Sequence, residues 1–367
     1  MDFITEALYQ EARQNHIGYK NVKMLVQSED ARKLAERVLM GHGVPPTHAR
    51  IQADLFIDAE LKGVASHGLL RLRRVIERIE AGLSAPGKTG AQKWAGRNYL
   101  MVDGERGLGP VVALAALDSV IPRALEDGVA LAAIRNTNHL GALAYYAEYV
   151  AARGLTVIAL TISEALVHPF GGRKAMIGTN PVAIGVPADP EPFVMDMATG
   201  LVSMGKIHDH ANRGEPIPLG WALDADGNPT TNAGDAKKGA IAPFGGAKGY
   251  ALGLAFEVLV AGLAASAIGT DVKGTLDSVE VSNKGDLFIV IAPRHADAAR
   301  ALVSAYLDEI RAMRPSDPAH PVLVPGDRAR ATKAKAVSHG LKLADGLWSD
   351  LQALDAELEK SAKGAAQ

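Results

Sequence analysis

The sequence contains no cysteine, which excludes disulfide bonds, thiolate catalysis and cysteine-based metal sites. This absence fits a reducing compartment, and we predict a cytoplasmic location. Long apolar runs are also missing, so we expect no membrane span. The first residues mix acidic and basic side chains without the apolar core of a signal peptide, and we interpret residues 1–26 as an N-terminal extension.

A strong excess of either charge is absent as well. The chain has 39 Lys and Arg residues against 41 Asp and Glu residues, a formal net charge of −2. Nucleic acids and anionic membranes favour clearly basic proteins, so we expect neither as a partner. A small anionic substrate needs only a local basic site. The length of 367 residues and the apolar share of 48% are typical of a globular protein of two or three domains.

The apolar pattern predicts an α/β (α+β) fold. Helices are expected from Ser28, from Thr47 to Gly63 and from Ser66 to Gly82. The expected strands are 129–134, 155–162, 181–187, 192–198 and 287–292. The expected later helices are 110–126, 141–153, 250–266 and 295–313, with more helix after residue 329, and residues 209–246 are expected to form a long functional loop. We therefore divide the chain into the extension 1–26, a mainly helical part formed by 27–102 plus 295–367, and an α/β part, 103–294.

The segment GVASHGLLRLRR at 63–74 holds the strongest candidate for a catalytic site. If a helix begins at Ser66, His67 and Arg71 lie four residues apart on one helical face. Arginine binds a carboxylate through two parallel hydrogen bonds, and histidine exchanges a proton near neutral pH. The pair therefore suits an α-keto or α-hydroxy carboxylate. The alternative is that Ser66 caps the helix while His67, Arg71 and Arg74 form a solvated basic face.

Ser66 and His67 also raise the alternative of a serine hydrolase. A nucleophile elbow requires the pattern G-x-S-x-G, but position 64 is valine. Neighbouring side chains on a helix diverge by about 100°, so we expect the two not to act as nucleophile and base.

Three further features were weighed as sites. His139 follows the expected strand 129–134 at a corner that often carries site residues in α/β proteins, although a structural histidine is the alternative. The strings GLGPVV at 107–112 and GGAKGY at 245–250 each miss a required residue, so neither a Rossmann nor a Walker site is predicted. The glycines around Lys248 still allow close approach of a phosphate, unless this is a turn with a surface lysine. His208 and His210 have the spacing of a metal pair on a strand, but no ligand motif supports them and we predict no metal site.

A series of specific strings occurs along the chain: SHGLLR (66–71), NHLGALAYY (138–146), PFGG (169–172), GTNPVAIGVPA (178–188), DMATG (196–200), GWALDADGNPTT (220–231), GGAKGY (245–250) and PGDR (325–328). Together they resemble the malate/L-lactate dehydrogenase type 2 family, whose members reduce 2-keto acids and cyclic imino acids with NAD(P)H. The family includes ureidoglycolate, sulfolactate and diketogulonate enzymes. The resemblance extends from about Gln27 to Gly340.

This resemblance implies a non-Rossmann NAD(P)-binding fold, NAD or NADP as cofactor, and a homodimer with the active site at or near the subunit interface. The α/β part would bind the cofactor, and the helical part would hold the substrate and the dimer contact. The implied reaction transfers a hydride between nicotinamide and a small 2-keto or 2-hydroxy acid, or alternatively a cyclic imino acid.

The resemblance also implies roles for individual residues. His67 matches the proton donor, oriented by Ser66 and Asp196, and a buried Asp196 would favour the charged form of His67. Arg71 matches the ligand of the substrate carboxylate, and His139 matches a second active-site histidine. The implied cofactor contacts are Ser163, Met197, Ala198, Thr199, Lys248, Gly326, Asp327 and Arg328.

Three positions depart from the family pattern. Val75 stands where tyrosine is frequent, Ile162 where asparagine is usual, and Gly200 where serine is usual. The loss of a tyrosine hydroxyl at position 75 affects the expected substrate more than the expected reaction.

Overall fold

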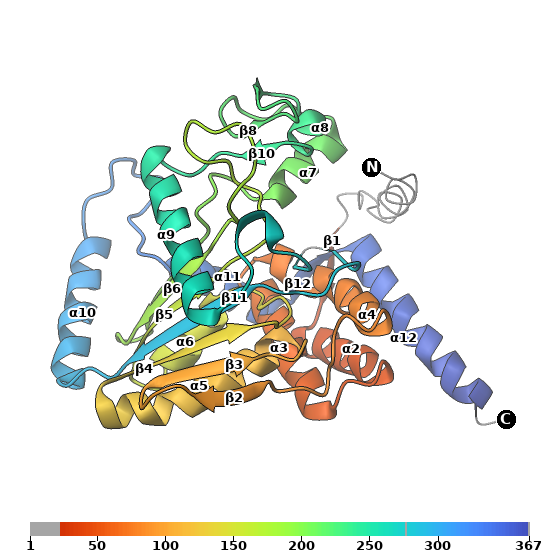
Figure 1. The fold of residues 1–367 in the computed structure, drawn as a ribbon, viewed down its shortest axis with the longest axis horizontal. Coiled ribbons are helices and arrows are strands. Elements are labelled where there is room, and N and C mark those ends of the chain that lie inside the picture. The colour runs from red at the N-terminus through yellow and green to blue at the C-terminus, as the bar shows by residue number, and fades with distance from the viewer. Residues whose placement is uncertain (1–22, 276, 366–367) are drawn as a thin grey trace.

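The computed structural model describes residues 23–275 and 277–365. Its centre is a seven-stranded mixed sheet (Figure 1). In spatial order the strands are β2 (Ala91–Trp94), β3 (Tyr99–Asp103), β4 (Val129–Arg135), β11 (Gly285–Ile291), β5 (Thr156–Thr161), β6 (Val182–Val186) and β7 (Phe193–Met197). Only β3 and β4 pair in parallel, and α5 (Gly109–Asp127) makes the crossover that such a pair requires. The predominantly antiparallel sheet confirms an α/β fold that is not of the Rossmann type.

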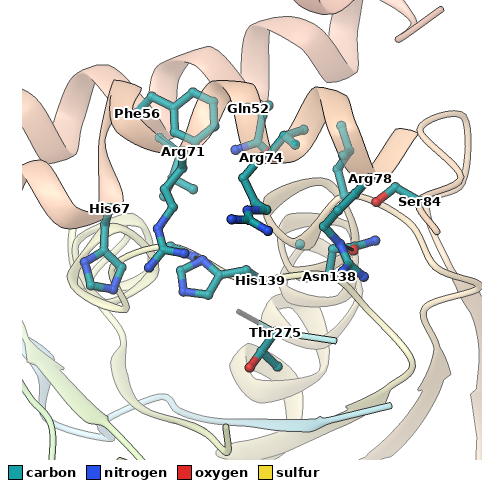
Figure 2. A pocket seen from close by; sticks show the side chains of 15 residues that line it. Gln52, Phe56, His67, Arg71, Arg74, Arg78, Ser84, Asn138, His139 and Thr275 are labelled. Atoms are coloured by element: carbon teal, nitrogen blue, oxygen red, sulfur yellow. Dashed lines mark hydrogen bonds between the residues drawn. The ribbon is translucent and has the colours of Figure 1, made fainter. Parts of the chain in front are cut away.

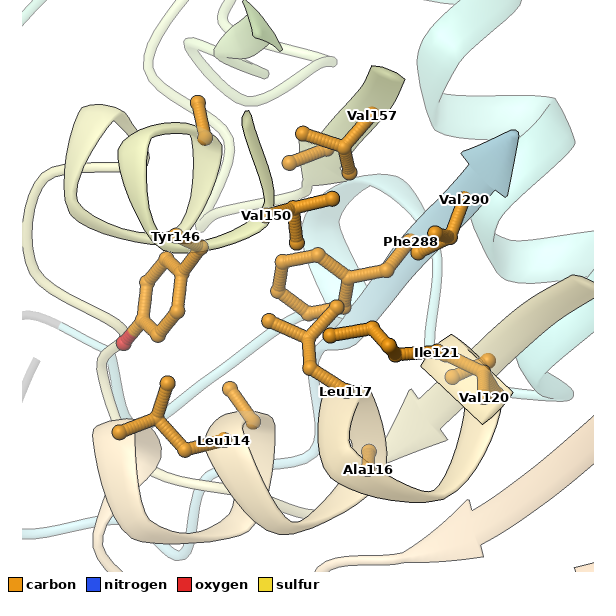
Figure 3. Close-up of a cluster of buried hydrophobic side chains, with 14 of the residues drawn as sticks. Leu114, Ala116, Leu117, Val120, Ile121, Tyr146, Val150, Val157, Phe288 and Val290 are labelled. Atoms are coloured by element: carbon orange, nitrogen blue, oxygen red, sulfur yellow. The ribbon is translucent and has the colours of Figure 1, made fainter. Parts of the chain in front are cut away.

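Helices cover both faces of this sheet. Helix α5 and helix α6 (Ala144–Ala151) lie on one face, and α9 (Ala247–Ala264) lies on the other. Successive side chains of a strand point to opposite faces, and β11 follows this rule. Phe288 packs against Tyr146 of α6, with ring centroids 5.5 Å apart (Figure 3), whereas Leu287 belongs to the cluster under α9.

The two ends of the chain form a separate helical layer. It contains α2 (Ser28–Gly41), α3 (Pro46–Leu61), α4 (Leu72–Glu80) and α12 (Asp345–Ala365), with α11 (Asp327–His339) beside α3. Strand β1 (Lys23–Val26) pairs antiparallel with β12 (Leu341–Ala344), which ties the two ends together. Both terminal segments therefore contribute helices to this layer, as the sequence predicted, while the division of the chain into domains stays a prediction. Most of the predicted extension, residues 1–22, lies outside the described residues.

Two boundaries of the predicted division need correction. Strands β2 and β3 precede residue 103, yet they form one edge of the sheet. Helix α10 (Ala296–Arg311) packs near β7, where Leu307 lies with Ala188 and Phe193, rather than on α2 and α3. The chain enters the α/β part before Ala91 and leaves it after α10.

The predicted loop 209–246 is more structured than expected. It contains the end of α7 (Met204–Arg213), the short helix α8 (Ala233–Ala236) and a three-stranded sheet. The strands of this sheet, in spatial order, are β10 (Ala240–Ile241), β8 (Ala222–Leu223) and β9 (Pro229–Thr230). His208 and His210 lie in α7 and not on a strand, so side chains two residues apart do not share a face.

Helix α9 is the one helix in the described part of the chain that is long and apolar enough to cross a membrane by length and composition. In the structure it contacts β11, β4 and β5 and covers one face of the sheet. Its outward residues Leu252, Val258 and Leu259 remain exposed. A short 3₁₀ turn, η3 (Gly269–Asp271), follows it.

Candidate active site

The segment that carries His67 and Arg71 is not the continuous helix that the spacing predicted. It forms two 3₁₀ turns, η1 (Ala65–His67) and η2 (Leu69–Arg71), and the α-helix begins only at Leu72. Gly68 separates the two turns with φ −92° and ψ −148°, which is outside the helical region. The predicted helix start at Ser66 is therefore wrong, and the break at Gly68 determines how the two side chains are presented.

Glu60, in the last turn of α3, holds this break in place. Its Oε1 accepts a hydrogen bond of 2.9 Å from the Leu69 N–H, and a Cβ added at Gly68 would lie 2.2 Å from the same oxygen. A side chain at position 68 would displace the Glu60 carboxyl group from this place. Burial raises the pKa of Glu60 to about 7.

The raised pKa of Glu60 predicts that Glu60→Gln changes the pH dependence of stability. An acid with a higher pKa in the folded state binds more protons than the unfolded chain, so wild-type stability falls as pH rises from about 4.5 to about 7. Glutamine keeps the acceptor oxygen but does not ionise. We expect the variant to match the wild type in thermal melting at pH 4 and to be more stable at pH 8. An equal difference at both pH values would contradict the assignment.

His67, Arg71 and His139 meet in one pocket, with the Arg71 guanidinium beside both imidazoles (Figure 2). The centroids of the two imidazole rings are 5.4 Å apart and the ring planes differ by 29°. Arg71 donates from Nε to the carbonyl of Ser66 at 2.8 Å, which leaves its two Nη groups for a ligand. His67 and Arg71 therefore lie in one pocket, as expected. The two 3₁₀ turns on either side of Gly68 bring them together, and not the spacing of a continuous helix.

Both histidines are held in their neutral form. Burial, and to a lesser degree the charge of Arg71, lowers the pKa of His67 to about 4. Burial together with the charges of Arg71, His67 and Lys284 places the pKa of His139 well below its ordinary value. The Gly141 N–H donates to Nδ1 of His139 at 3.0 Å, so its proton resides on Nε2. The charge of Arg71 lowers the pKa of both histidines, so an anionic ligand near Arg71 would raise both pKa values.

Of the two residues predicted to orient His67, Ser66 contacts it and Asp196 does not. Ser66 Oγ lies 3.0 Å from Nδ1 of His67, so the expectation that these neighbours diverge is wrong, because the segment is a tight turn and not an α-helix. Asp196, at the end of β7, accepts instead from the Ala144 N–H at 2.8 Å, and no hydrogen bond joins it to His67 in the described part of the chain. The expectation that Asp196 favours charged His67 is also wrong, since the pKa of His67 is lowered and the pKa of Asp196 is raised by its surroundings.

Some of the residues predicted to contact the cofactor lie close together in the structure. Ser163, just after β5, receives a hydrogen bond from the Thr179 N–H at 3.1 Å. Thr199, just after Met197 and Ala198, donates from its N–H and its hydroxyl to the Thr179 carbonyl at 2.7 and 2.9 Å. A Cβ at Gly253 of α9 would lie 2.8 Å from Thr199 Oγ1, so this helix approaches closely. Lys248 is exposed in the first turn of α9.

The predicted residues Gly326, Asp327 and Arg328 lie at the start of α11. Asp327 is already paired, because Arg311 donates to both of its oxygens at 2.9 and 3.0 Å and Arg330 also contacts it. These ion pairs hold the pKa of Asp327 well below its usual range. In the structure the carboxylate of Asp327 therefore fixes the start of the helix, while Arg328 is exposed.

Several pocket residues escaped the sequence analysis as site residues. Asn138, Arg78 and Thr275 line the pocket together with Arg74 and Val75. The spacing of Arg71, Arg74 and Arg78 by three and four residues was the available signal for the arginines. Nothing in the sequence indicated Thr275, which lies 197 positions after Arg78 in the chain. Among the described residues, no group of three or more His, Asp or Glu side chains is placed to hold a metal ion.

The known proteins that this chain resembles are dehydrogenases and a related reductase. Residues 26–352 match the family described as malate/L-lactate dehydrogenase. The L-sulfolactate dehydrogenase of Methanocaldococcus jannaschii is 37% identical over 338 residues, which covers 91% of this chain and 97% of that protein. A delta(1)-pyrroline-2-carboxylate/delta(1)-piperideine-2-carboxylate reductase of Pseudomonas aeruginosa is 37% identical over 280 residues, or 74% of this chain and 82% of that protein. A solved dehydrogenase structure from Sinorhizobium meliloti has a TM-score of 0.88 and 51% identity, and the match covers 92% of this chain and 99% of that one.

Proposed function

The chain belongs to the malate/L-lactate dehydrogenase family, and from this premise we propose that it transfers a hydride between NAD(P) and a small 2-keto or 2-hydroxy acid. The observation that carries the proposal is the pocket in which Arg71 lies beside two neutral histidines. A guanidinium with free Nη groups binds a carboxylate, and an imidazole next to it lies within reach of the adjacent carbonyl.

The residues present fit a nicotinamide dinucleotide. Helix α9 begins at Ala247, and Gly246 before it provides no side-chain cap. Lys248 lies exposed in the first turn, so N–H groups and an ammonium are available to phosphate oxygens. Ser163 and Thr199 both hydrogen-bond to the backbone of Thr179, and α9 approaches Thr199 at Gly253. When bound, the nicotinamide supplies or accepts the hydride. We propose Ser163, Met197, Ala198, Thr199 and Lys248 as contacts of the cofactor. Gly326, Asp327 and Arg328 are proposed as further contacts, at the start of α11 that the ion pairs of Asp327 hold in place.

The side chains of the pocket bind the substrate and transfer the proton. Arg71 holds the substrate carboxylate, and His139 donates from Nε2 toward the reacting oxygen. His67 passes a proton to that oxygen during reduction and removes it during oxidation, with Ser66 orienting its ring through Nδ1. Binding of the substrate anion to Arg71 offsets the smaller of the two causes that lower the pKa of His67, and it therefore favours the protonated form of His67. Asp196 accepts from the Ala144 N–H at the start of α6 and makes no hydrogen bond to His67 in the described part of the chain, so it is assigned no step.

A substrate panel tests the function. Purified protein is expected to oxidise NADH or NADPH, followed near 340 nm, with at least one of pyruvate, oxaloacetate, sulfopyruvate and a cyclic imino acid. The cyclic imino acid is the second candidate substrate, favoured by the likeness to the Pseudomonas reductase. Failure of every substrate with both cofactors would contradict the proposal. Ester turnover with phosphonate labelling of Ser66 would instead support the hydrolase alternative.

We also propose that the protein is a cytoplasmic homodimer. The exposed apolar residues Leu252, Val258 and Leu259 on α9 support a partner surface of this kind, because large apolar side chains in a row are typical of interfaces. The lack of cysteine supports a reducing compartment. A monomer in sedimentation velocity would contradict the dimer.

A further inference from the structure

Helix α9 packs one of its sides closely against the chain around Thr199. Three of its buried residues, Gly249, Gly253 and Glu257, are spaced four apart and therefore lie along one side of the helix. The approach is close at Gly253, since a Cβ there would lie 2.8 Å from Thr199 Oγ1. The next position on this side carries a carboxyl group, and only 1% of Glu257 is exposed.

The Glu257 carboxyl group accepts hydrogen bonds from three N–H groups. Oε1 accepts from the Gly269 N–H at 2.8 Å, and Oε2 accepts from the Gly178 N–H at 3.1 Å and from Nδ2 of Asn180. Burial of a carboxyl group is unfavourable unless such donors replace water. The carboxyl group therefore joins α9 to two other segments, the loop before β6 and the turn η3.

The loop before β6 has a backbone conformation that depends on these contacts. Asn180 is fully buried and has a φ of +33°, a positive value that residues other than glycine seldom adopt. Its Nδ2 group donates to the Gly253 carbonyl at 3.0 Å as well as to Glu257. Residues in such conformations persist only where the surrounding contacts fix them, and here α9 supplies both acceptors of the Asn180 Nδ2 group.

Thr179, which lies between Gly178 and Asn180, bonds directly to two of the proposed cofactor contacts. Its N–H donates to Ser163 Oγ at 3.1 Å. Its carbonyl accepts from the N–H and the hydroxyl of Thr199 at 2.7 and 2.9 Å. The backbone of Thr179 thus determines where both hydroxyl groups lie, and the hydrogen bonds on either side of it determine where that backbone lies.

We propose that Glu257 is a positioning residue of the cofactor site, which holds residues 178–180 so that Ser163 and Thr199 are placed to contact the nicotinamide dinucleotide. This inference rests on the proposed function and adds to it a residue that acts through hydrogen bonds to the backbone behind those contacts. Loss of these hydrogen bonds would weaken cofactor binding. It would leave substrate binding intact, since the lining of the pocket around Arg71, within the described part of the chain, includes none of these residues.

Glu257→Gln tests the positioning role. Glutamine has the same shape but carries an NH₂ group in place of one oxygen, so at least one of the three N–H donors loses its acceptor. We expect the dissociation constant of NADH or NADPH, measured by fluorescence titration without substrate, to rise about tenfold or more. The KM for the cofactor should rise with it. At saturating cofactor, kcat should not fall, and the KM for the keto acid should stay within about twofold of the wild type.

Two further variants make the result specific. Asn180→Gly tolerates the positive φ but removes the amide that binds Glu257, so it should weaken cofactor binding in the same direction. Val260→Ala removes buried methyl groups three residues further along α9, from the apolar cluster between this helix and the sheet. It should lower the melting temperature and leave the dissociation constant of the cofactor unchanged.

The outcomes separate the positioning role from the function. Wild-type cofactor affinity in folded Glu257→Gln would overturn the role of Glu257 and leave the proposed function standing; if this variant does not fold, Asn180→Gly decides in the same way. Equal weakening in Val260→Ala would also overturn it, because cofactor affinity would then follow the stability of α9. If the wild type binds neither NADH nor NADPH, the proposed function fails and the positioning role fails with it.

Discussion

Replacing His67 with asparagine is expected to lower kcat by about 10²-fold or more while cofactor affinity stays nearly unchanged. Asparagine keeps a polar side chain beside Ser66 but carries no exchangeable proton of suitable pKa. His67 touches Ser66 and His139 and is not among the proposed cofactor contacts. Steady-state kinetics and a fluorescence titration of the reduced cofactor measure the two quantities separately.

The matched control for this variant is His139→Asn. The two rings lie in the same pocket, so a general disturbance of the pocket would affect both variants alike. His139 receives the Gly141 N–H at Nδ1 and therefore presents a fixed donor, and its loss should be milder than the loss of a proton carrier. A larger loss in His139→Asn, with His67→Asn mild, would reverse the two roles.

If His67 carries the proton, its lowered pKa also determines how kcat/KM depends on pH. Burial and Arg71 lower this pKa from 6.5 to about 4, so the free protein carries neutral His67 throughout the neutral range. Oxidation of a hydroxy acid needs the neutral form, and its kcat/KM should be flat from pH 5 to 8 with respect to His67. Reduction needs the protonated form, whose fraction falls tenfold for each pH unit above about 4. A pH-independent kcat/KM for reduction would show that another group supplies the proton.

The long elements of the fold followed from the sequence because their signals are local. Strand β11, for example, carries a continuous apolar run, as expected of a strand covered on both faces, and α5 carries its buried side chains at helical spacing over 19 residues. The small sheet inside 209–246 was missed because each of its strands is two residues long, too short for a periodic pattern.

The local geometry at Gly68 could not be predicted for a different reason. The apolar residues Leu69, Leu72 and Ile76 continue a helical pattern through this point, and the pattern alone indicates one helix from Ser66. The break depends on the Glu60 carboxyl, which belongs to the preceding helix and occupies the space of a side chain at position 68. Such a tertiary contact overrides local propensity. Helical spacing predicted the pairing of His67 with Arg71, and the family resemblance implied their roles, whereas Arg78, Asn138 and Thr275 as lining residues required the structure.

Arg71→Lys is expected to lower kcat/KM by about 10- to 150-fold even though it keeps the charge. The Nε of Arg71 is bound to the Ser66 carbonyl at 2.8 Å, so the guanidinium plane is fixed and presents both Nη groups to the substrate carboxylate. Lysine offers a point charge on a flexible chain and cannot make both the bond to Ser66 and a paired contact with the carboxylate. The loss of one aligned charged hydrogen bond costs about 1.5–3 kcal/mol, which corresponds to this range.

Arg73→Ala provides the internal control, because Arg73 is exposed and points away from the pocket. This variant should be nearly silent. Equal losses at positions 71 and 73 would show that a diffuse basic field attracts the substrate, and strong dependence on salt concentration would accompany that result. The amide analogue of the preferred substrate gives a complementary test, since it keeps the reacting carbonyl and removes the anion. If the amide is reduced as efficiently as the acid, Arg71 does not bind the carboxylate.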